Sequence, residues 1–419
     1  MTKANDEERV VVTGIGTVNA IAGDPRAFAN ALQNGVCGIG PITLFDTTAF
    51  RTHNGAQVRD FSPRTAIPAG ISIKRASRSD LFALAATFQA LAQAGLDPVP
   101  EDLREEMGVV IGGGAGGLLE AEDFFQDYLR KGGAKARFSR LAPVSCASTA
   151  NHLVRSLGLM GPKTTIMTAC SSGATAVGLA MDLIRSGAAR AMIAGGTEPL
   201  SRMTFASFNA LKAVDPGYCR PFSGNREGLS LGEAAGMLVL ESLAGARKRG
   251  APILAEVMGY GVTCDSHHMT APDTGASGAV RSMRAALADA GLPPDDVDYI
   301  NAHGTATPPN DLMETRAIKE VFGPRAKRIP VSSTKSMHGH TLGAAGALEA
   351  VVSVLAITEG FIPPTIHWET PDPECDLDYV TTGARDIAPK VVLSNSFAFG
   401  GNNTTVIFGR RPEEGVLHG

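Results

Sequence analysis

The chain has 419 residues, of which 44% are hydrophobic, 19% are charged and 5% are aromatic. This length is enough for one large fold or for two to three domains, and the composition suits a well-buried enzyme. The formal net charge of −4 gives no indication that nucleic acid or an anionic membrane is the main partner.

The sequence predicts a cytoplasmic protein with free thiols. Charged residues continue up to Arg9 and a strand-like run follows at once, so the N-terminus has no apolar signal core. The longest apolar stretch, residues 343–357, carries Glu349 and is judged too short to span a membrane. The cysteines are scattered and form no CxxC pair, which favours reduced thiols. They are Cys37, Cys146, Cys170, Cys219, Cys264 and Cys375.

Short strand-like runs alternate with helical patterns along the whole chain. In chain order, the clearest apolar runs cover residues 9–16, 108–114, 191–198, 236–242, 253–261, 297–305, 329–335 and 390–401. Helical patterns such as residues 79–96 and 278–292 lie between them, with a glycine near each end. Continuous apolar strands that alternate with helices predict an α/β protein whose sheets are covered on both faces.

The two halves of the chain repeat one arrangement. In the first half, a strand-like run from Thr165 leads to Cys170 and then into an Ala/Gly-rich helix. In the second half, residues 329–340 lead into a similar helix over residues 341–357. Small residues on both helices would allow them to pack closely against each other. The basic segment 246–252 is the best boundary between the halves.

Cys170 stands where a strand is predicted to give way to a helix. A helix N-terminus carries unpaired N–H groups and a partial positive charge. A thiol there is expected to have a lowered pKa and to be a better nucleophile, and the same N–H groups can stabilise an oxyanion. The alternative is that Cys170 is a small buried hydrophobic residue.

Two histidines favour the catalytic interpretation of Cys170. His303 ends an apolar strand, and His340 opens the second small-residue helix with Lys335 shortly before it. Each could also be a structural hydrogen-bonding residue. No metal site is predicted, because His338 and His340 lack a companion Cys or His at ligand spacing. The glycine runs lack the GxGxxG pattern of dinucleotide binding.

Motifs along nearly the whole chain resemble one family. They are TACSSGATAVG (168–178), CRPFSGNREGLSLGEAAG (219–236), NAHGTATPPNDLMET (301–315), KSMHGHTLGAAGALEA (335–350), PPTIHWETPDPECDLDYV (363–380) and SNSFAFGGNNTTVIF (394–408). The sequence resembles a β-ketoacyl-acyl carrier protein synthase, and is similar to the elongating type II synthases of bacteria. This resemblance implies the thiolase-like fold, a five-layered α-β-α-β-α arrangement of two similar halves, here residues 1–250 and 251–419.

The resemblance also implies the catalytic roles. Cys170 would be the nucleophile that accepts the acyl group, with the backbone N–H groups of Cys170 and Phe399 as the oxyanion hole. His303 and His340 would assist decarboxylation, and Lys335 would hold the electrostatics of the site with Glu349 as its partner. An ordinary carboxylate on a helix face is the alternative for Glu349.

Further positions are expected to contact substrate or carrier. The resemblance assigns substrate binding to Thr305, Thr307, Phe208, Ala115, Phe399, Gly400 and Gly401. It assigns two gating loops to segments that include Asp265, His268, Phe399 and Asn402. Basic residues that could dock an acidic carrier protein are Lys74, Arg75, Arg78, Arg130 and Lys131. Ala115 is smaller than the residue that many family members carry there, which leaves acyl specificity open.

The implied enzyme is an acyltransferase that condenses an acyl group, held as a Cys thioester, with malonyl-acyl carrier protein in fatty-acid elongation. It needs no cofactor of its own, because its substrates carry phosphopantetheine. A homodimer is expected, and a heterodimer with a chain-length factor is an alternative. Also left open are a specialised polyketide or polyene pathway and a non-catalytic chain-length factor. A biosynthetic thiolase is disfavoured, because FAFGGNN carries no second catalytic Cys.

Overall fold

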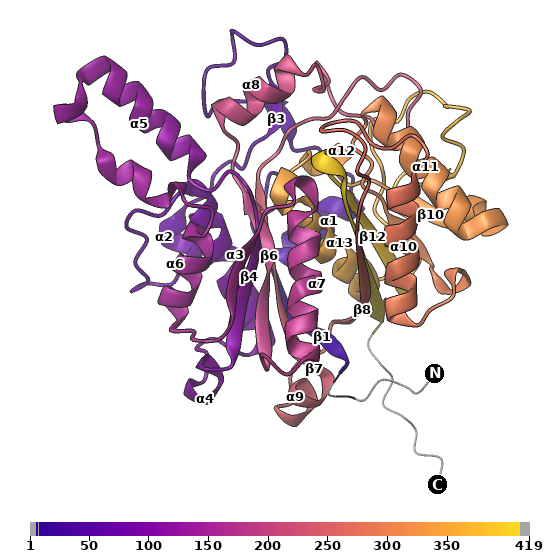
Figure 1. The fold of residues 1–419 in the computed structure, drawn as a ribbon, viewed down its shortest axis with the longest axis horizontal. Helices are drawn as coiled ribbons and strands as arrows, with labels where there is room; N and C mark the ends of the chain where they lie inside the picture. The colour runs from indigo at the N-terminus through magenta and orange to yellow at the C-terminus, as the bar shows by residue number, and fades with distance from the viewer. Residues whose placement is uncertain (1–5, 7, 411–419) are drawn as a thin grey trace.

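Eleven β-strands from both halves of the chain form one continuous sheet in the computed structural model, which describes residue 6 and residues 8–410 (Figure 1). In the first half the order from the edge is β5 (Lys163–Ile166), β4 (Met107–Gly112), β6 (Ala191–Glu198), β7 (Ala234–Ser242) and β1 (Val10–Asn19). The order continues with β8 (Ala255–Cys264), β13 (Asn402–Arg410), β12 (Val391–Phe397), β9 (Tyr299–Asn301), β10 (Pro330–Ser332) and β11 (Asp378–Tyr379).

The two halves of this sheet meet between β1 and β8. These strands pair antiparallel from Val10 opposite Val257 to Val12 opposite Ala255. The strands next to them are also antiparallel, whereas β4, β5 and β6 in the first half and β9, β10 and β12 in the second pair in parallel. Each half is therefore a mixed sheet whose parallel strands lie away from the junction.

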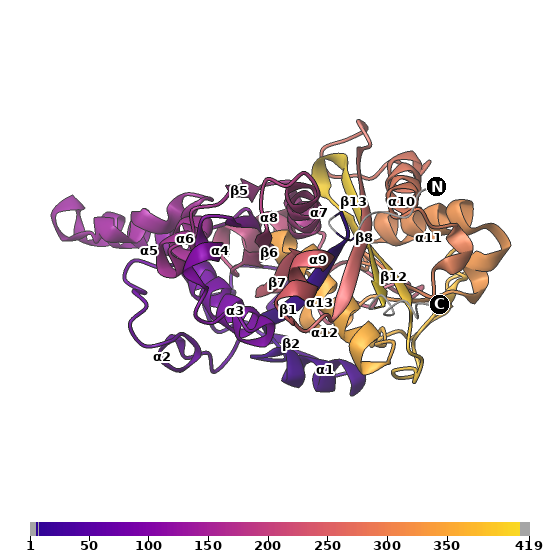
Figure 2. The same cartoon turned by 90° about the horizontal axis from the view of Figure 1, so that it is seen from below.

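Helices cover both faces of each half-sheet, and the layers run from left to right in Figure 2. On the outer faces lie α3 (Arg78–Ala94) and α6 (Ser148–Leu157) in the first half, and α10 (Ser277–Ala290) and α11 (Pro308–Phe322) in the second. Between the half-sheets lie α7 (Ser172–Arg185) and α13 (Ala345–Glu359). The five-layered α-β-α-β-α fold is therefore confirmed.

The pleat of the strands explains how the side chains of one strand pack into two hydrophobic cores, one on each face of the sheet. Successive side chains point to opposite faces of a sheet. In β7, Leu238 and Leu240 pack in the central core with α7 and α13, whereas Met237 and Val239 pack in the outer core with α3. A strand buried on both faces is apolar without alternation, as the sequence showed.

The two central helices touch through small residues. A Cβ atom added at Gly173 of α7 would lie 2.6 Å from the backbone nitrogen of Ala347 in α13. A Cβ atom at Gly346 of α13 would lie 2.7 Å from the backbone nitrogen of Ala174 in α7. The close packing predicted for these helices is confirmed, and it brings the two halves into direct contact.

The remaining helices and strands lie in the segments that connect these elements. They are α1 (Pro25–Gln33), β2 (Ile39–Pro41), β3 (Asn54–Ala56), α2 (Pro63–Ala66), α4 (Glu101–Arg104), α5 (Leu118–Lys131), α8 (Arg202–Ala210), α9 (Leu243–Lys248) and α12 (Lys335–His338). Short 3-10 turns are η1 (Gly133–Lys135), η2 (Phe138–Val144), η3 (Ala169–Ser171), η4 (Pro294–Asp296), η5 (Gly323–Arg328), η6 (Leu342–Ala344) and η7 (Phe399–Gly401).

Two local expectations need correction. The strand before Cys170 ends at Ile166, and Cys170 lies on the η3 turn, because Ala169 adopts a left-handed φ of 50° that no strand allows. The apolar segment Leu342–Glu359 is long and apolar enough to cross a membrane, so the argument from length was wrong. Because 83% of it is buried inside the fold, it is a core helix.

Candidate active site

Cys170 is held on a tight turn directly before α7. The Ser172 hydroxyl accepts the N–H of Thr168 at 2.9 Å and donates to the carbonyl of Ala169 at 2.7 Å. These hydrogen bonds hold the turn in place. Cys170 is buried, with 6% of its surface exposed.

The second half of the chain brings both predicted histidines to this sulfur. His340 Nε2 lies 3.1 Å from Cys170 Sγ, and the rings of His303 and His340 are nearly perpendicular, with centroids 5.3 Å apart. His340 Nδ1 accepts the N–H of Leu342 at 3.3 Å, so a neutral ring carries its proton on Nε2. His340 therefore presents an N–H donor to the sulfur.

Burial controls the protonation of these groups. It raises the pKa of the Cys170 thiol to about 12, although the charge of Lys335 and the backbone N–H groups of Phe399 and Cys170 act in the opposite direction. The predicted lowering of the thiol pKa is therefore wrong for the resting site, because desolvation of a thiolate outweighs the helix N-terminus. Burial and then the charge of Lys335 lower the pKa of His303 and His340 well below 6.5, so both rings are neutral at pH 7.

Lys335 and Glu349 form a buried ion pair beside the histidines. Their side chains are 1% and 0% exposed, on α12 and α13. Burial raises the pKa of Glu349 to about 7 against the effect of Lys335. The pairing expected from the sequence is present, and the charge of Lys335 adds to burial, the larger cause, in disfavouring imidazolium at both histidines.

Phe399 lines the same cavity as Cys170. Its backbone N–H and that of Cys170 act to lower the pKa of the thiol against burial, and they are the pair of donors expected for an oxyanion hole. Gly400 and Gly401, with φ of 84° and 76°, let the chain turn there. The Phe399 ring stacks on Phe208 of α8, with centroids 5.7 Å apart.

A cavity of about 310 Å³ opens onto Cys170. The predicted catalytic residues His303 and His340 line it. So do several predicted substrate and gating residues, namely Phe208, Asp265, Thr305, Thr307 and Phe399. Five other predicted substrate or gating residues are not among the described residues that line the cavity; they are Ala115, His268, Gly400, Gly401 and Asn402. The N–H of Ala115 instead donates to Glu198.

Comparison with known proteins identifies the family. Residues 7–246 match the family model described as the β-ketoacyl synthase N-terminal domain, and residues 254–369 match the β-ketoacyl synthase C-terminal domain. The chain belongs to the β-ketoacyl synthase family.

Its relatives match over nearly their full length. The chain is 45% identical over 411 residues to 3-oxoacyl-[acyl-carrier-protein] synthase 2 of Synechocystis sp., covering 96% of this chain and 98% of the relative. Among solved structures it resembles the ishigamide ketosynthase/chain length factor, with a TM-score of 0.92, 38% identity and coverage of 96% and 99%. It also resembles a type II PKS acyl-carrier protein in complex with its ketosynthase, with a TM-score of 0.85, 32% identity and coverage of 96% and 99%.

Two buried carboxylates support this β-ketoacyl synthase site and were not singled out from the sequence. Glu314 of α11 accepts the backbone N–H groups of His303 and Gly304, each at 2.8 Å. Glu198 of β6 accepts those of Gly114, Ala115 and Gly343, so it joins the two halves. The sequence signal for Glu198 is a carboxylate after an apolar and small-residue run, whereas Glu314 lies in a helix with several other charged residues and no local pattern marks it.

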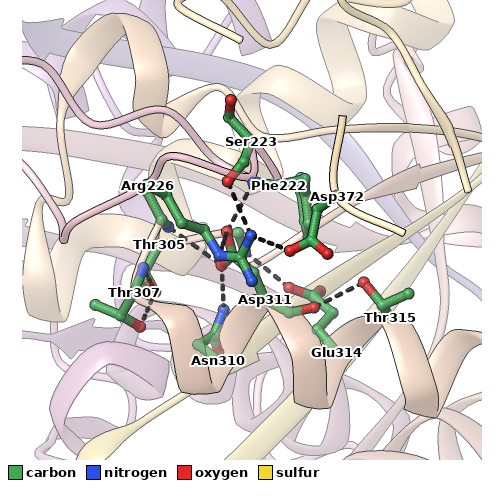
Figure 3. Close-up of polar contacts among 12 residues, drawn as sticks. Phe222, Ser223, Arg226, Thr305, Thr307, Asn310, Asp311, Glu314, Thr315 and Asp372 are labelled. Atoms are coloured by element: carbon green, nitrogen blue, oxygen red, sulfur yellow. Dashed lines mark hydrogen bonds and ion pairs between the residues drawn. The ribbon is translucent and has the colours of Figure 1, made fainter. Parts of the chain in front are cut away.

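An ionic network holds the turn that carries Thr305 and Thr307 (Figure 3). Asp311 accepts the N–H groups of Phe222 at 2.8 Å and Ala306 at 3.2 Å. Arg226 lies 3.7 Å from Asp311 and 2.6 Å from Asp372. The network therefore ties this turn to a segment of the first half and to the loop that contains Asp372.

The two predicted gating segments are hydrogen-bonded to each other. The N–H of Asp265 donates to the carbonyl of Gly401 at 2.9 Å, and that of Gly400 donates to Met269 at 2.8 Å. Asn403 Nδ2 donates to the Asp265 carboxylate at 2.6 Å. His268 accepts N–H groups of its own turn, and the Asn402 carbonyl accepts the N–H of Ala398.

One predicted docking residue needs correction. Arg78 contacts the buried carboxylate of Glu233 at 2.6 Å and the carbonyl of Val58 at 2.8 Å, so its guanidinium serves the fold. The other four candidates have exposed side chains, although Lys131 pairs with Asp127; they are Lys74, Arg75, Arg130 and Lys131. Within the described residues, no group of three or more His, Cys, Asp or Glu side chains could hold a metal ion.

Proposed function

We propose that this chain catalyses the decarboxylating Claisen condensation of an acyl group, held on Cys170, with malonyl-acyl carrier protein in fatty-acid elongation. The product is 3-oxoacyl-acyl carrier protein. The observation that carries the proposal is the approach of His340 Nε2 to Cys170 Sγ at 3.1 Å, with His303 beside it in one cavity.

In the first half-reaction the sulfur of Cys170 attacks the thioester carbon of an acyl-carrier protein. The new C–S bond forms first, and the bond to the carrier sulfur breaks when the resulting oxyanion collapses; the proton of the Cys170 thiol passes to the departing sulfur. The N–H groups of Cys170 and Phe399 hold the oxyanion between these events. Because burial disfavours the free thiolate, the sulfur loses its proton during the attack and not before it.

In the second half-reaction the malonyl thioester carbonyl accepts hydrogen bonds from His303 and His340. The bond to the carboxylate breaks with release of carbon dioxide, and its electron pair forms an enolate that the two neutral imidazoles stabilise as donors. The carbanion carbon then attacks the acyl thioester of Cys170, and the sulfur leaves as a thiolate and takes a proton from water. Burial keeps the histidines neutral, and Lys335, which pairs with Glu349, adds to this effect.

The proposal needs no resident cofactor, because the reacting thioesters arrive on phosphopantetheine. We place the enzyme in the cytoplasm with acyl carrier protein as its partner, which the carrier complex of a related ketosynthase supports. Homodimer formation is supported by the edge strand β5, which pairs on one side only within the described part of the chain. Met160 and Met167 beside it are 65% and 58% exposed, and such an edge favours pairing with a second copy.

The test is condensation with purified protein, acyl-carrier protein and radiolabelled malonyl-carrier protein. Labelled 3-oxoacyl product is expected, and Cys170→Ala should abolish it. Cys219→Ala is the matched control, because Cys219 is also a buried thiol, 1% exposed. Decarboxylation without product by the wild type, or condensation by Cys170→Ala, would overturn the proposal.

A further inference from the structure

Lys212 lies at the exposed end of the cavity that contains Cys170. It follows the last turn of α8 and lines the cavity, together with the acidic residues Glu227 and Asp265. Among the described lining residues it is the only lysine or arginine. Because Lys212 is exposed and Cys170 is buried, the cavity runs from a cation at its mouth to the sulfur inside.

The backbone gives no reason for a lysine at this position. Lys212 has a left-handed φ of 54°, a conformation that glycine adopts freely and that a residue with a Cβ atom adopts under strain. Its N–H donates to the carbonyl of Asn209 at 3.0 Å, and the N–H of Ala213 donates to Phe208 at 3.1 Å. This is the helix-ending geometry in which glycine is the usual residue.

The ammonium group is available for a ligand. None of the ion pairs or side-chain hydrogen bonds within the described part of the chain involves the Lys212 side chain, whereas Arg78, Arg202 and Arg226 are all paired. A strained, unpaired cation at the mouth of an active-site cavity therefore points to an anionic group that arrives from outside.

The proposed reaction supplies such a group. The phosphopantetheine arm carries its thioester at one end and a phosphodiester at the other, next to the carrier protein. When the thioester reaches Cys170, the phosphodiester remains toward the mouth of the cavity. Lysine binds phosphate as a compact point charge with three donors.

We propose that Lys212 binds the phosphodiester of the phosphopantetheine arm at the cavity mouth and so contributes to recognition of the carried substrate. The inference rests on the function proposed above. It assigns the phosphate end of the arm to α8, at the opposite end of the cavity from the nucleophile.

The experiment uses carrier-free substrates, so that protein docking does not contribute. Acyl and malonyl thioesters of 4′-phosphopantetheine are compared with the same thioesters of pantetheine, which lacks the phosphate. The wild type should favour the phosphorylated substrates in kcat/KM, and Lys212→Gly should lose about threefold to tenfold with them alone, mainly in KM. High salt should reduce the preference of the wild type but not that of the variant.

Two controls separate this effect from damage to the fold. Lys212→Gly relaxes the strained backbone, so its Tm should equal or exceed that of the wild type. Lys248→Gly removes the same charge from α9, at the opposite end of the molecule from α8 in Figure 1, and should leave the preference unchanged. An equal loss with both substrate types, or no loss with the phosphorylated ones, overturns the inference. Failure of the wild type to condense either type overturns the proposed function instead.

Discussion

The two halves of the molecule contribute different chemistry from corresponding places. Before α7 the first half presents one nucleophile, Cys170, together with a backbone N–H group. Before α13 the second half presents the hydrogen-bond donor His340, with His303 and Lys335 close to it. Neither half contains a complete site, so the reaction depends on the contact between α7 and α13.

Removal of a histidine from the second half should have the largest effect on rate. We expect His303→Ala and His340→Ala to lower the condensation rate about 10²- to 10⁴-fold, because each removes a donor to the developing enolate. Initial rates with malonyl-carrier protein measure this. Acyl transfer to Cys170 should fall less, because its oxyanion is held by backbone N–H groups.

His338→Gln is the matched control. His338 is fully buried two residues before His340, but its ring nitrogens lie 2.9 Å from Thr334 Oγ1 and from the carbonyl of Gly339. The rate should stay within about threefold of the wild type. If this variant loses as much activity as His340→Ala, the division of labour between the histidines is wrong.

Loss of Arg226 should destabilise the connection between the halves. Arg226 belongs to the first half and pairs with Asp311 and Asp372 of the second. Arg226→Ala leaves the buried Asp311 without its cation, and we expect the free energy of unfolding to fall by about 3–5 kcal/mol. Urea denaturation measures this change. Arg284→Ala, which breaks an exposed pair with Glu320, should change stability by less than about 1 kcal/mol.

The pH dependence of the free energy of unfolding should report the protonation of Glu198, which accepts hydrogen bonds from N–H groups of both halves. Burial raises its pKa from 4.5 to about 7, so the folded state binds its proton more tightly than the unfolded state. That contribution is present in full below pH 4.5 and is lost as the pH rises through 7. Relative to Glu198→Gln, the wild type should therefore lose about 3 kcal/mol between pH 4.5 and pH 8. A wild type that keeps or gains stability relative to Glu198→Gln as the pH rises would contradict the assignment.

The smallest effect is expected where α7 meets α13. Gly173→Ala places a Cβ atom 2.6 Å from the backbone of Ala347, and overpacking of this kind costs about 1–3 kcal/mol. Gly23→Ala is the control, because a Cβ atom there meets nothing within 4 Å. Thermal unfolding compares the two. Equal Tm values would mean that the central contact is looser than described.

The sequence allowed prediction of features that local patterns determine. The small residues of the central helices predicted their close contact, and the family motifs indicated Cys170, His303 and His340 as a group. The pairing of Lys335 with Glu349 was also expected, since the resemblance placed both in one site.

Features that depend on tertiary partners could not be predicted. The thiol pKa of Cys170 is governed by burial, which no local pattern reports. Arg78 was expected at the surface, but Glu233, 155 residues away, takes up its guanidinium. The supporting roles of Glu198 and Glu314 arise from backbone N–H groups that the fold brings to them.

Trapping the acyl-enzyme tests the central claim most directly. The protein is incubated with acyl-carrier protein without a malonyl donor, and its peptides are then analysed by mass spectrometry. We predict one acyl group per chain, on the peptide that contains Cys170, with no change in Cys219→Ala, although burial raises the pKa of both thiols to about 12. An acyl group on any other residue, or a label that persists in Cys170→Ala, would contradict the account.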